Sequence, residues 1–237
     1  MKKITVESDF WALFPDAQIK VLTVKNVHNQ NSEESRAYFT ELLKNGKKEA
    51  QKYLTEETFS LNPVVAEWRK AFSQFKTKKG ARSSIEALLK RVSQDRDFTP
   101  INPLVDSYNS ISLTYGLPCG GEDVHSIQGN LHLGKAQGGE GFRPLGAEAD
   151  SPALPEEIIY YDDAGAICRC FNWREAQRTM LTEHTTDAIL VMEAINSVQV
   201  QRANEAIADL KDLVDTYFKI ESRVLTLTRE NPSVSIY

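Results

Sequence analysis

The sequence of 237 residues predicts an α+β fold, a single compact domain with a mixed sheet flanked by helices. Apolar residues recur at helical spacing through most of 31–116 and again over 197–218. Short segments of β-branched and aromatic residues, bounded by turn residues, lie at 19–27 and throughout 131–195. No repeat, low-complexity segment or linker divides the chain, so we expect one domain over 1–237.

Composition is that of an ordinary folded protein, with 41% hydrophobic and 26% charged residues. The formal net charge of −5 provides no general attraction to phosphate, so RNA would need a local basic patch. Three cysteines, without a CxxC spacing, are typical of reduced thiols. With no secretory pattern and no long apolar run, the sequence predicts a cytoplasmic protein that does not enter the membrane.

The N-terminal part, 1–80, is predicted to hold a strand followed by helices. Residues 19–27 alternate apolar and polar side chains and predict a half-buried strand. Ser32 with the acids after it predicts a helix that runs toward Leu43 and ends near Gly46, before a second helical stretch at 47–54.

Three further helices are predicted from their first residues. One begins at Pro63 and closes with the lysines after Phe75, and the next is capped by Ser83 or Ser84. In the third, Asn102 is the expected N-cap, Pro103 the first helical residue, and Gly116 the C-terminal stop.

The remaining elements are strands and a closing helix. Amphipathic spacing after Ser197 predicts a long helix within the closing part, 196–237, and 223–228 predicts a terminal strand. The expected strands between these helices are 131–135, 142–145, 158–161, 166–171 and 188–195.

Several motifs of known chemistry are absent: the Walker loop, GxGxxG, HExxH and GxSxG. Their absence lowers the prior for nucleotide hydrolysis, dinucleotide chemistry and zinc proteolysis. The CxC pair Cys168 and Cys170, with scattered histidines, is weak support for a metal. We expect no metal and no cofactor.

A cluster of cations surrounds Gly80 and comprises Lys76, Lys78, Lys79 and Arg82. One interpretation is a patch that contacts RNA phosphates. The other is a solvated helix end whose cations complement the helix dipole.

A row of polar residues on the helix after Asn102 includes Asp106 and Asn109, at spacings of four and seven residues. These groups could bind a substrate in a pocket. They could equally form a buried polar strut that holds the helix to neighbouring backbone amides.

The segment LPCGGEDVHSI brings Glu122 and His125 together after two glycines. A carboxyl and an imidazole could orient a water molecule for catalysis, and the glycines would let backbone amides approach the ligand. The alternative is a loop that only caps the strands after it.

A denser set of candidate substrate-binding residues lies in the segment FNWREAQRT. Guanidinium groups bind carboxylates and phosphates, and an indole ring stacks on bases. The alternative is a structural ion pair between these arginines and a nearby glutamate. The candidates are Asn172, Trp173, Arg174, Glu175 and Arg178.

Five motifs over 82–195 occur in the order found in the tRNA-binding and editing domain of the phenylalanyl-tRNA synthetase β subunit, its third and fourth modules. They are PINPLVDSYN, GLP, GGE, YYDDAG and TEHTTDAILVMEA. The chain resembles the stand-alone relatives of that domain, in which NWR replaces a glycine-rich turn. The resemblance implies a mixed α+β fold with a pocket; in the synthetase that pocket hydrolyses tyrosine wrongly esterified to phenylalanine tRNA.

Two positions bear on how far the resemblance carries. Where the synthetase has a histidine two residues after the proline of Gly-x-Pro, this chain has Gly120, and His125 follows five residues later. Glu175 is the nearest candidate for the synthetase's tyrosine-selecting glutamate.

Three functions therefore compete. The first is a deacylase acting in trans on mischarged aminoacyl-tRNA, in which Asn109 and Asn172 fix the aminoacyl group and Arg174 and Arg178 hold the carbonyl or terminal phosphate. The second is a tRNA- or RNA-binding module without catalysis. The third is binding or hydrolysis of a free amino acid or related small metabolite.

Overall fold

Two β-sheets and the helices beside them form the molecule, of which the computed structural model describes residues 2–236. One sheet has six strands in the order β10-β1-β4-β5-β6-β7, with β1 and β4 parallel and the other pairs antiparallel. The other sheet is antiparallel, in the order β3-β8-β2-β9. The predicted α+β class with a mixed sheet flanked by helices is confirmed, although the strands divide between two sheets.

The strands are β1 (Lys3–Val6), β2 (Gln18–Val24), β3 (Cys119–Asp123), β4 (Leu131–Lys135), β5 (Ile158–Asp162), β6 (Gly165–Arg169), β7 (Arg174–Glu175), β8 (Ala188–Ala194), β9 (Arg223–Leu227) and β10 (Ser233–Ser235). The α-helices are α1 (Ser8–Leu13), α2 (Glu33–Ala50), α3 (Pro63–Phe72), α4 (Ser84–Ser93), α5 (Pro103–Tyr115) and α6 (Ser197–Phe218). Three 3-10 turns lie at Gln51–Tyr53, Phe59–Leu61 and Val124–Ser126.

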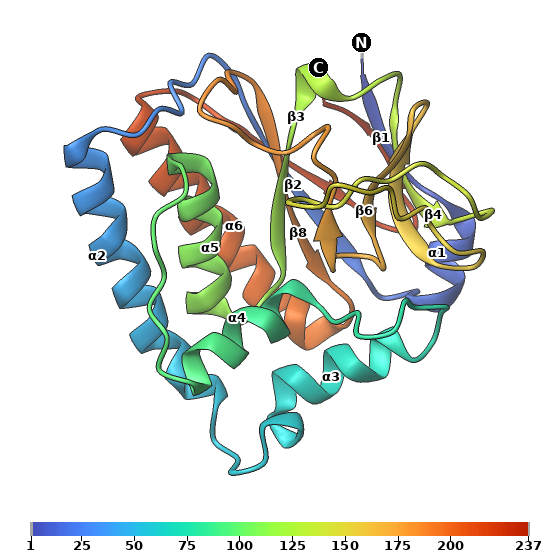
Figure 1. The fold of residues 1–237 in the computed structure, drawn as a ribbon, viewed down its shortest axis with the longest axis horizontal. Coiled ribbons are helices and arrows are strands. Elements are labelled where there is room, and N and C mark those ends of the chain that lie inside the picture. The colour runs from blue at the N-terminus through green and yellow to red at the C-terminus, as the bar shows by residue number, and fades with distance from the viewer. Residues whose placement is uncertain (1, 237) are drawn as a thin grey trace.

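The four-stranded sheet is the middle layer of the molecule. Ile189 and Val191 of β8 join a core with strands of the six-stranded sheet, whereas Leu190 and Met192 join a second core with α5 and α6. Alternation along β8 thus feeds both cores, which is why all of its residues are buried. Figure 1 shows α2, α5 and α6 on one side of β3, β2 and β8, and β1, β4 and β6 on the other.

Helix α5 follows the prediction at both ends. The side chain of Asn102 accepts a hydrogen bond from the backbone N–H of Val105, 3.1 Å away, and Pro103 is the first helical residue. Gly116 ends the helix with φ +62°, the left-handed conformation that favours glycine. The predicted strands at β2, β4, β5 and β8 and the long helix α6 are also confirmed.

Helix α2 corrects the predicted stop at Gly46. The helix continues through this residue to Ala50, so the two short helices predicted here are one. A Cβ atom at Gly46 would lie 3.1 Å from the carbonyl oxygen of Ser110 and 3.3 Å from Cβ of Leu113. The glycine therefore serves the close approach of α5 to α2, which its sequence neighbours do not reveal.

Several segments differ from the predicted elements because their partners are distant in sequence. Residues 119–123, expected in a loop, form the strand β3 on the edge of the four-stranded sheet, paired with β8. The predicted strand 142–145 makes only an isolated bridge, between Pro144 and Ala176. Helix α3 ends at Phe72, so the basic segment 76–82 is irregular backbone rather than a helix end. Strands β1, β7 and β10 were not predicted.

Among the described residues, no helix is both long and apolar enough to cross a membrane.

We expect Gly46→Val to destabilise the protein by about 1–3 kcal/mol, because its methyl groups would press against Ser110 and Leu113 of α5. The control is Asn45→Val, at an exposed position of the same helix, where the two residues have similar helix propensity. Because valine is a better helix former than glycine, a net loss at position 46 would come from the contact with α5. Urea denaturation monitored by circular dichroism measures the difference. Equal losses in the two variants would contradict the packing role of Gly46.

Candidate functional site

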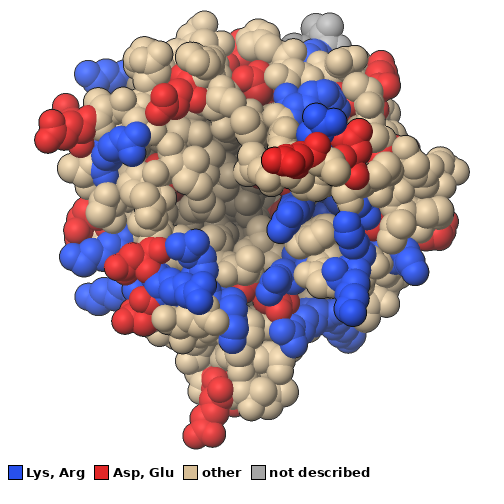
Figure 2. Space-filling model, viewed as in Figure 1, with Lys and Arg blue, Asp and Glu red and all other residues tan. Residues whose placement is uncertain are grey.

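A cavity of about 290 Å³ lies between β3, β6, β7 and β8, with the start of α4 at one side. Its polar groups come from elements far apart in sequence: Ser84, Glu122, Tyr160, Asn172, Glu175 and Glu193. Leu131, Leu145 and Val191 supply apolar wall. Figure 2 shows this face of the molecule hollowed near its middle, where β3 lies in Figure 1. The cavity combines an apolar wall with a few polar groups, as small-molecule sites usually do.

Glu193 projects from β8 into the space between the two sheets and is only 3% exposed. The Tyr160 hydroxyl donates a hydrogen bond to Oε1 over 3.0 Å, and the Asn172 amide donates to Oε2 over 3.4 Å. Burial raises the pKa of Glu193 to about 8, because the charged form loses hydration. Without a ligand, the carboxyl is mostly protonated at neutral pH.

Glu122 of β3 and Glu175 of β7 form a second acidic centre in the same cavity. Burial raises the pKa of Glu175 to about 7. Burial, and next the charge of Glu175, raise the pKa of Glu122 well above its usual range. The two carboxyls are electrostatically coupled, so they resist being ionised together.

Glycine at position 120 keeps this centre open. A Cβ atom there would lie 3.2 Å from Oε1 of Glu175. The glycine of the edge strand therefore leaves the space that the carboxyl of Glu175 occupies.

Three buried polar atoms of the cavity residues lack a hydrogen-bond partner: Oγ of Ser84, Oε2 of Glu122 and Oδ1 of Asn172. Unpartnered buried polar atoms cost about 1–3 kcal/mol each, and folded proteins hold few of them. Their gathering around one cavity indicates that it is built to receive a polar ligand.

The turn after β6 places Asn172 on the cavity wall. Its first two residues, Cys170 and Phe171, both have the left-handed backbone conformation, with φ of 48° and 65°. Phe171 is fully buried against Phe10 and Trp68, and its N–H donates to the carbonyl of Ile158 over 2.6 Å. Because the ring of Phe171 points into the core, the side chain of the next residue, Asn172, points toward the cavity.

Trp173 and Arg174 lie at the edge of the cavity. Arg174 is exposed, and its guanidinium lies 5.3 Å from the centre of the Trp173 ring. Both groups are free to offer an aromatic face and a cation to a ligand that enters.

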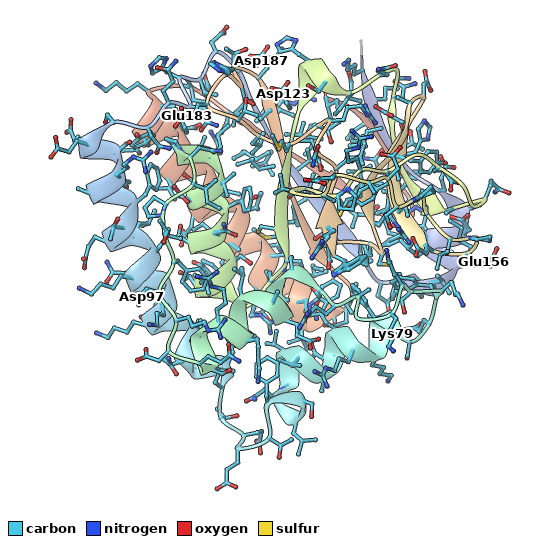
Figure 3. All side chains as sticks on the ribbon, viewed as in Figure 1. Lys79, Asp97, Asp123, Glu156, Glu183 and Asp187 are labelled. Carbon is cyan, nitrogen blue, oxygen red and sulfur yellow. The ribbon has the colours of Figure 1, made fainter. Side chains whose placement is uncertain are left out.

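The basic segment 76–82 adjoins the same turn. The N–H of Ser84 donates to the carbonyl of Asn172 over 3.1 Å, and the N–H of Lys78 contacts Sγ of Cys170 at 3.4 Å. Lys76, Lys78, Lys79 and Arg82 are all exposed. In Figure 2 lysine and arginine side chains gather below and to the right of the hollow, on the side where Figure 3 labels Lys79.

The structure places four other predicted site residues outside the set that lines the cavity. Asp106 is a buried strut, whose two carboxylate oxygens accept from the N–H of Ile101 at 2.9 and 3.0 Å. Its neighbour on α5, Asn109, is half-buried and also absent from the cavity wall.

The other two bind carboxylates outside the cavity lining, Arg178 in an ion pair and His125 in a hydrogen bond. Arg178 binds the carboxylate of Asp162 through two hydrogen bonds, of 2.7 and 2.8 Å, and donates to the carbonyl of Ser126. His125 is exposed, and its Nε2 lies 2.8 Å from Oδ2 of Asp187. Figure 3 labels Asp187 together with Asp123 at the far end of β3.

Of the predicted residues, the structure thus brings Glu122, Asn172, Trp173, Arg174 and Glu175 together. Sequence reasoning missed Glu193, Tyr160 and Ser84. A signal for Glu193 was present, because it is the one charged residue in the apolar run AILVMEAI.

Two cysteine thiols lie at the cavity. Cys119 and Cys168 line it, and burial raises both thiol pKa values well above the usual value, which disfavours the reactive thiolate. The described residues contain no group of three or more His, Cys, Asp or Glu side chains positioned to hold a metal ion.

A family model described as the B3/4 domain matches residues 67–219. One similar solved structure is an N-terminal fragment of the phenylalanyl-tRNA synthetase β-subunit from Pyrococcus horikoshii, with 10% sequence identity and a TM-score of 0.43. The match covers 93% of this chain and 49% of that one, so the chain spans about half of the fragment's length. No curated protein matches this sequence.

The raised carboxyl pKa values predict that the empty protein loses stability as the pH rises. Between the unfolded value near 4.5 and the folded values of about 7 and 8, the folded state holds more protons than the unfolded state, so the free energy of unfolding falls with pH. We expect the melting temperature to fall by several degrees from pH 5.5 to 8.5, at ~2–4 °C per kcal/mol.

The variant Glu193→Gln isolates this effect from general charge repulsion, because it keeps the shape of the side chain and removes the titration. Its fall in melting temperature over the same range is expected to be smaller than that of the wild type. Parallel curves for the two proteins in differential scanning fluorimetry would contradict a buried, protonated Glu193.

Proposed function

This chain belongs to the B3/4 domain family, as its resemblance to the third and fourth modules of the synthetase β subunit predicted. On that basis we propose that it binds the aminoacyl end of a tRNA and hydrolyses the ester of a mischarged amino acid. The observation that carries the proposal is the cavity with unpartnered buried polar atoms, joined by the turn at Asn172 to an exposed basic segment. The cavity is of a size for an aminoacyl group.

In this proposal the cavity residues hold the aminoacyl group and the segment 76–82 contacts the tRNA backbone. Asn172 and Glu122 each have a free polar atom for the aminoacyl group. Arg174 would approach a terminal phosphate and Trp173 the face of the terminal base. The exposed lysines provide the local attraction that a net charge of −5 does not.

Glu175 is the group best suited to move the proton. Its pKa of about 7 lets it accept a proton at neutral pH and return it. The ionised carboxylate takes a proton from a water molecule, whose oxygen attacks the ester carbonyl carbon. The bond from that carbon to the ribose oxygen then breaks, and the proton passes from Glu175 to the ribose oxygen. Glu175 thereby replaces His125, which lies outside the cavity wall, as the proposed partner of Glu122 in catalysis.

A second candidate function is binding of a free amino acid in the same cavity. The acidic groups of its interior favour a small amine, and Arg174 at its edge is placed to meet a carboxylate. Measurable affinity for free amino acids, together with an absence of deacylation, would favour this candidate over the first.

Deacylation of a panel of mischarged tRNAs tests the first function directly. We expect amino acid release that depends on the cavity, with a rate that rises with pH through about 7 as Glu175 ionises. Glu175→Gln should slow it by ~100-fold or more, since the amide cannot accept the proton. Glu41→Gln, exposed on α2, is the control. Equal rates in the two variants would remove Glu175 from the mechanism.

Contact between the basic segment and tRNA is tested by charge reversal. Lys79→Glu should weaken tRNA binding at low salt and reduce its salt dependence, because it removes a cation beside the cavity. Lys48→Glu makes the same change at an exposed position of α2, outside the cavity lining and outside segment 76–82, and should have a smaller effect. Filter binding at several salt concentrations measures both; indistinguishable losses would argue against a site at segment 76–82.

A further inference from the structure

The cavity contains two acidic centres on different strands. Glu193 of β8, held by Tyr160 and Asn172, is the first. The pair formed by Glu122 of β3 and Glu175 of β7 is the second. Among the described residues that line the cavity, Arg174 is the only basic one, and it is exposed at the edge. A positive charge on a ligand would therefore be favoured inside and disfavoured at the mouth.

The hydrogen bonds around Glu193 are arranged for its charged form. Each of its carboxyl oxygens receives one donor, the Tyr160 hydroxyl or the Asn172 amide. Because the Asn172 amide nitrogen is used in this way, its unpartnered oxygen is an acceptor. Oε2 of Glu122 makes no close hydrogen bond, although the hydroxyl of Thr179 acts on this carboxyl, and both residues are at least nine-tenths buried. The missing partner of the Asn172 oxygen is a hydrogen-bond donor, such as an ammonium group.

We propose that the cavity selects an amino acid with a cationic side chain, such as lysine or ornithine, whose two ammonium groups bind at the two acidic centres. The ester carbonyl then points to the mouth, toward Arg174 and the segment 76–82. A single ammonium could satisfy only one centre and would leave the other buried and unpaired. The statement that the ligand is an ester of tRNA rests on the proposed function. The selectivity of the cavity for two ammonium groups does not require catalysis.

Proton exchange accompanies such binding. Burial favours the neutral forms of the carboxyls in the empty cavity, and ammonium groups favour their charged forms, so binding releases protons. Arg178 is a cation that acts on Glu122 from outside the cavity, and it is already paired with Asp162. The other titratable groups that act on the three carboxyls are acidic: Tyr108, Cys119, Tyr160, Asp162 and Cys168.

The test compares two stable amides, L-lysinamide and L-norleucinamide, by isothermal titration calorimetry. Both have the α-ammonium group and a long side chain, and only lysinamide has the second ammonium. We expect lysinamide to bind at least tenfold more tightly at pH 7, where most of the α-amino groups are protonated, and to release more protons, measured in two buffers of different ionisation enthalpy. Affinities within twofold of each other, or no binding of either amide at 10 mM, would overturn the proposal.

Glu193→Gln should reduce lysinamide affinity at least fivefold and leave norleucinamide within twofold. The matched control is Glu205→Gln, exposed on α6, which should change neither. The melting temperature of Glu193→Gln is measured first, and we expect no decrease because the wild-type carboxyl is already neutral at pH 7. Unchanged lysinamide affinity in this folded variant would overturn the role of Glu193.

Failure of the selectivity and failure of the proposed function give different results. Selective lysinamide binding without deacylation of any mischarged tRNA would contradict the proposed ester hydrolysis and support the proposed selectivity for a cationic ligand. Deacylation of tRNAs charged with lysine or ornithine no faster than of those charged with neutral amino acids would support the esterase and overturn the selectivity.

Discussion

The buried ion pair between Arg169 and Glu157 is the constraint on which the rest of the site depends. Neither side chain is more than 1% exposed, and two hydrogen bonds, of 2.5 and 2.8 Å, join guanidinium and carboxylate. A third, of 2.6 Å, runs from Nη1 of Arg169 to the carbonyl of Ser151. Removal of either partner would leave an uncompensated buried charge, a loss of about 3–5 kcal/mol in other proteins. The pair thus fixes the end of β6 against the loop before β5.

The position of the cavity wall formed by the turn after β6 depends on the fixed end of this strand. The next two residues adopt left-handed backbone conformations, which cost free energy in residues other than glycine. They persist because Phe171 is buried in the aromatic cluster, while Arg169 is held on the preceding side. Asn172 is thereby placed beside Glu193, and the N-terminus of α4 is hydrogen-bonded to the same turn. The acidic centre and the basic segment share one anchor.

Features that depend on residues close in sequence could be predicted, whereas features that depend on distant residues could not. Helix α5 could be predicted because its cap, its first proline and its closing glycine act within a few residues of one another. The stop at Gly46 was wrong because the contact that requires a glycine is made with α5, more than sixty residues later. The glycine-rich strand β3 has weak intrinsic propensity and forms through its pairing with β8. The cluster at 172–175 was predicted as a site, whereas Glu193 was read as part of a strand because its partners, Tyr160 and Asn172, lie on other elements.

Position 120 has a consequence for how such a pocket can change over generations. The resemblance to the synthetase predicts a histidine here, whereas this chain has a glycine, and a Cβ atom at this position would lie 3.2 Å from the carboxyl of Glu175, closer than ordinary van der Waals contact. A side chain at 120 and a buried acid at 175 compete for the same volume. Whether a residue is tolerated at position 120 therefore depends on the residue at position 175, and the reverse also holds. This mutual dependence is epistasis. A lineage that exchanged one pocket for the other would need to change both positions, and intermediates with a single change would carry either a close contact or an unfilled space beside position 120.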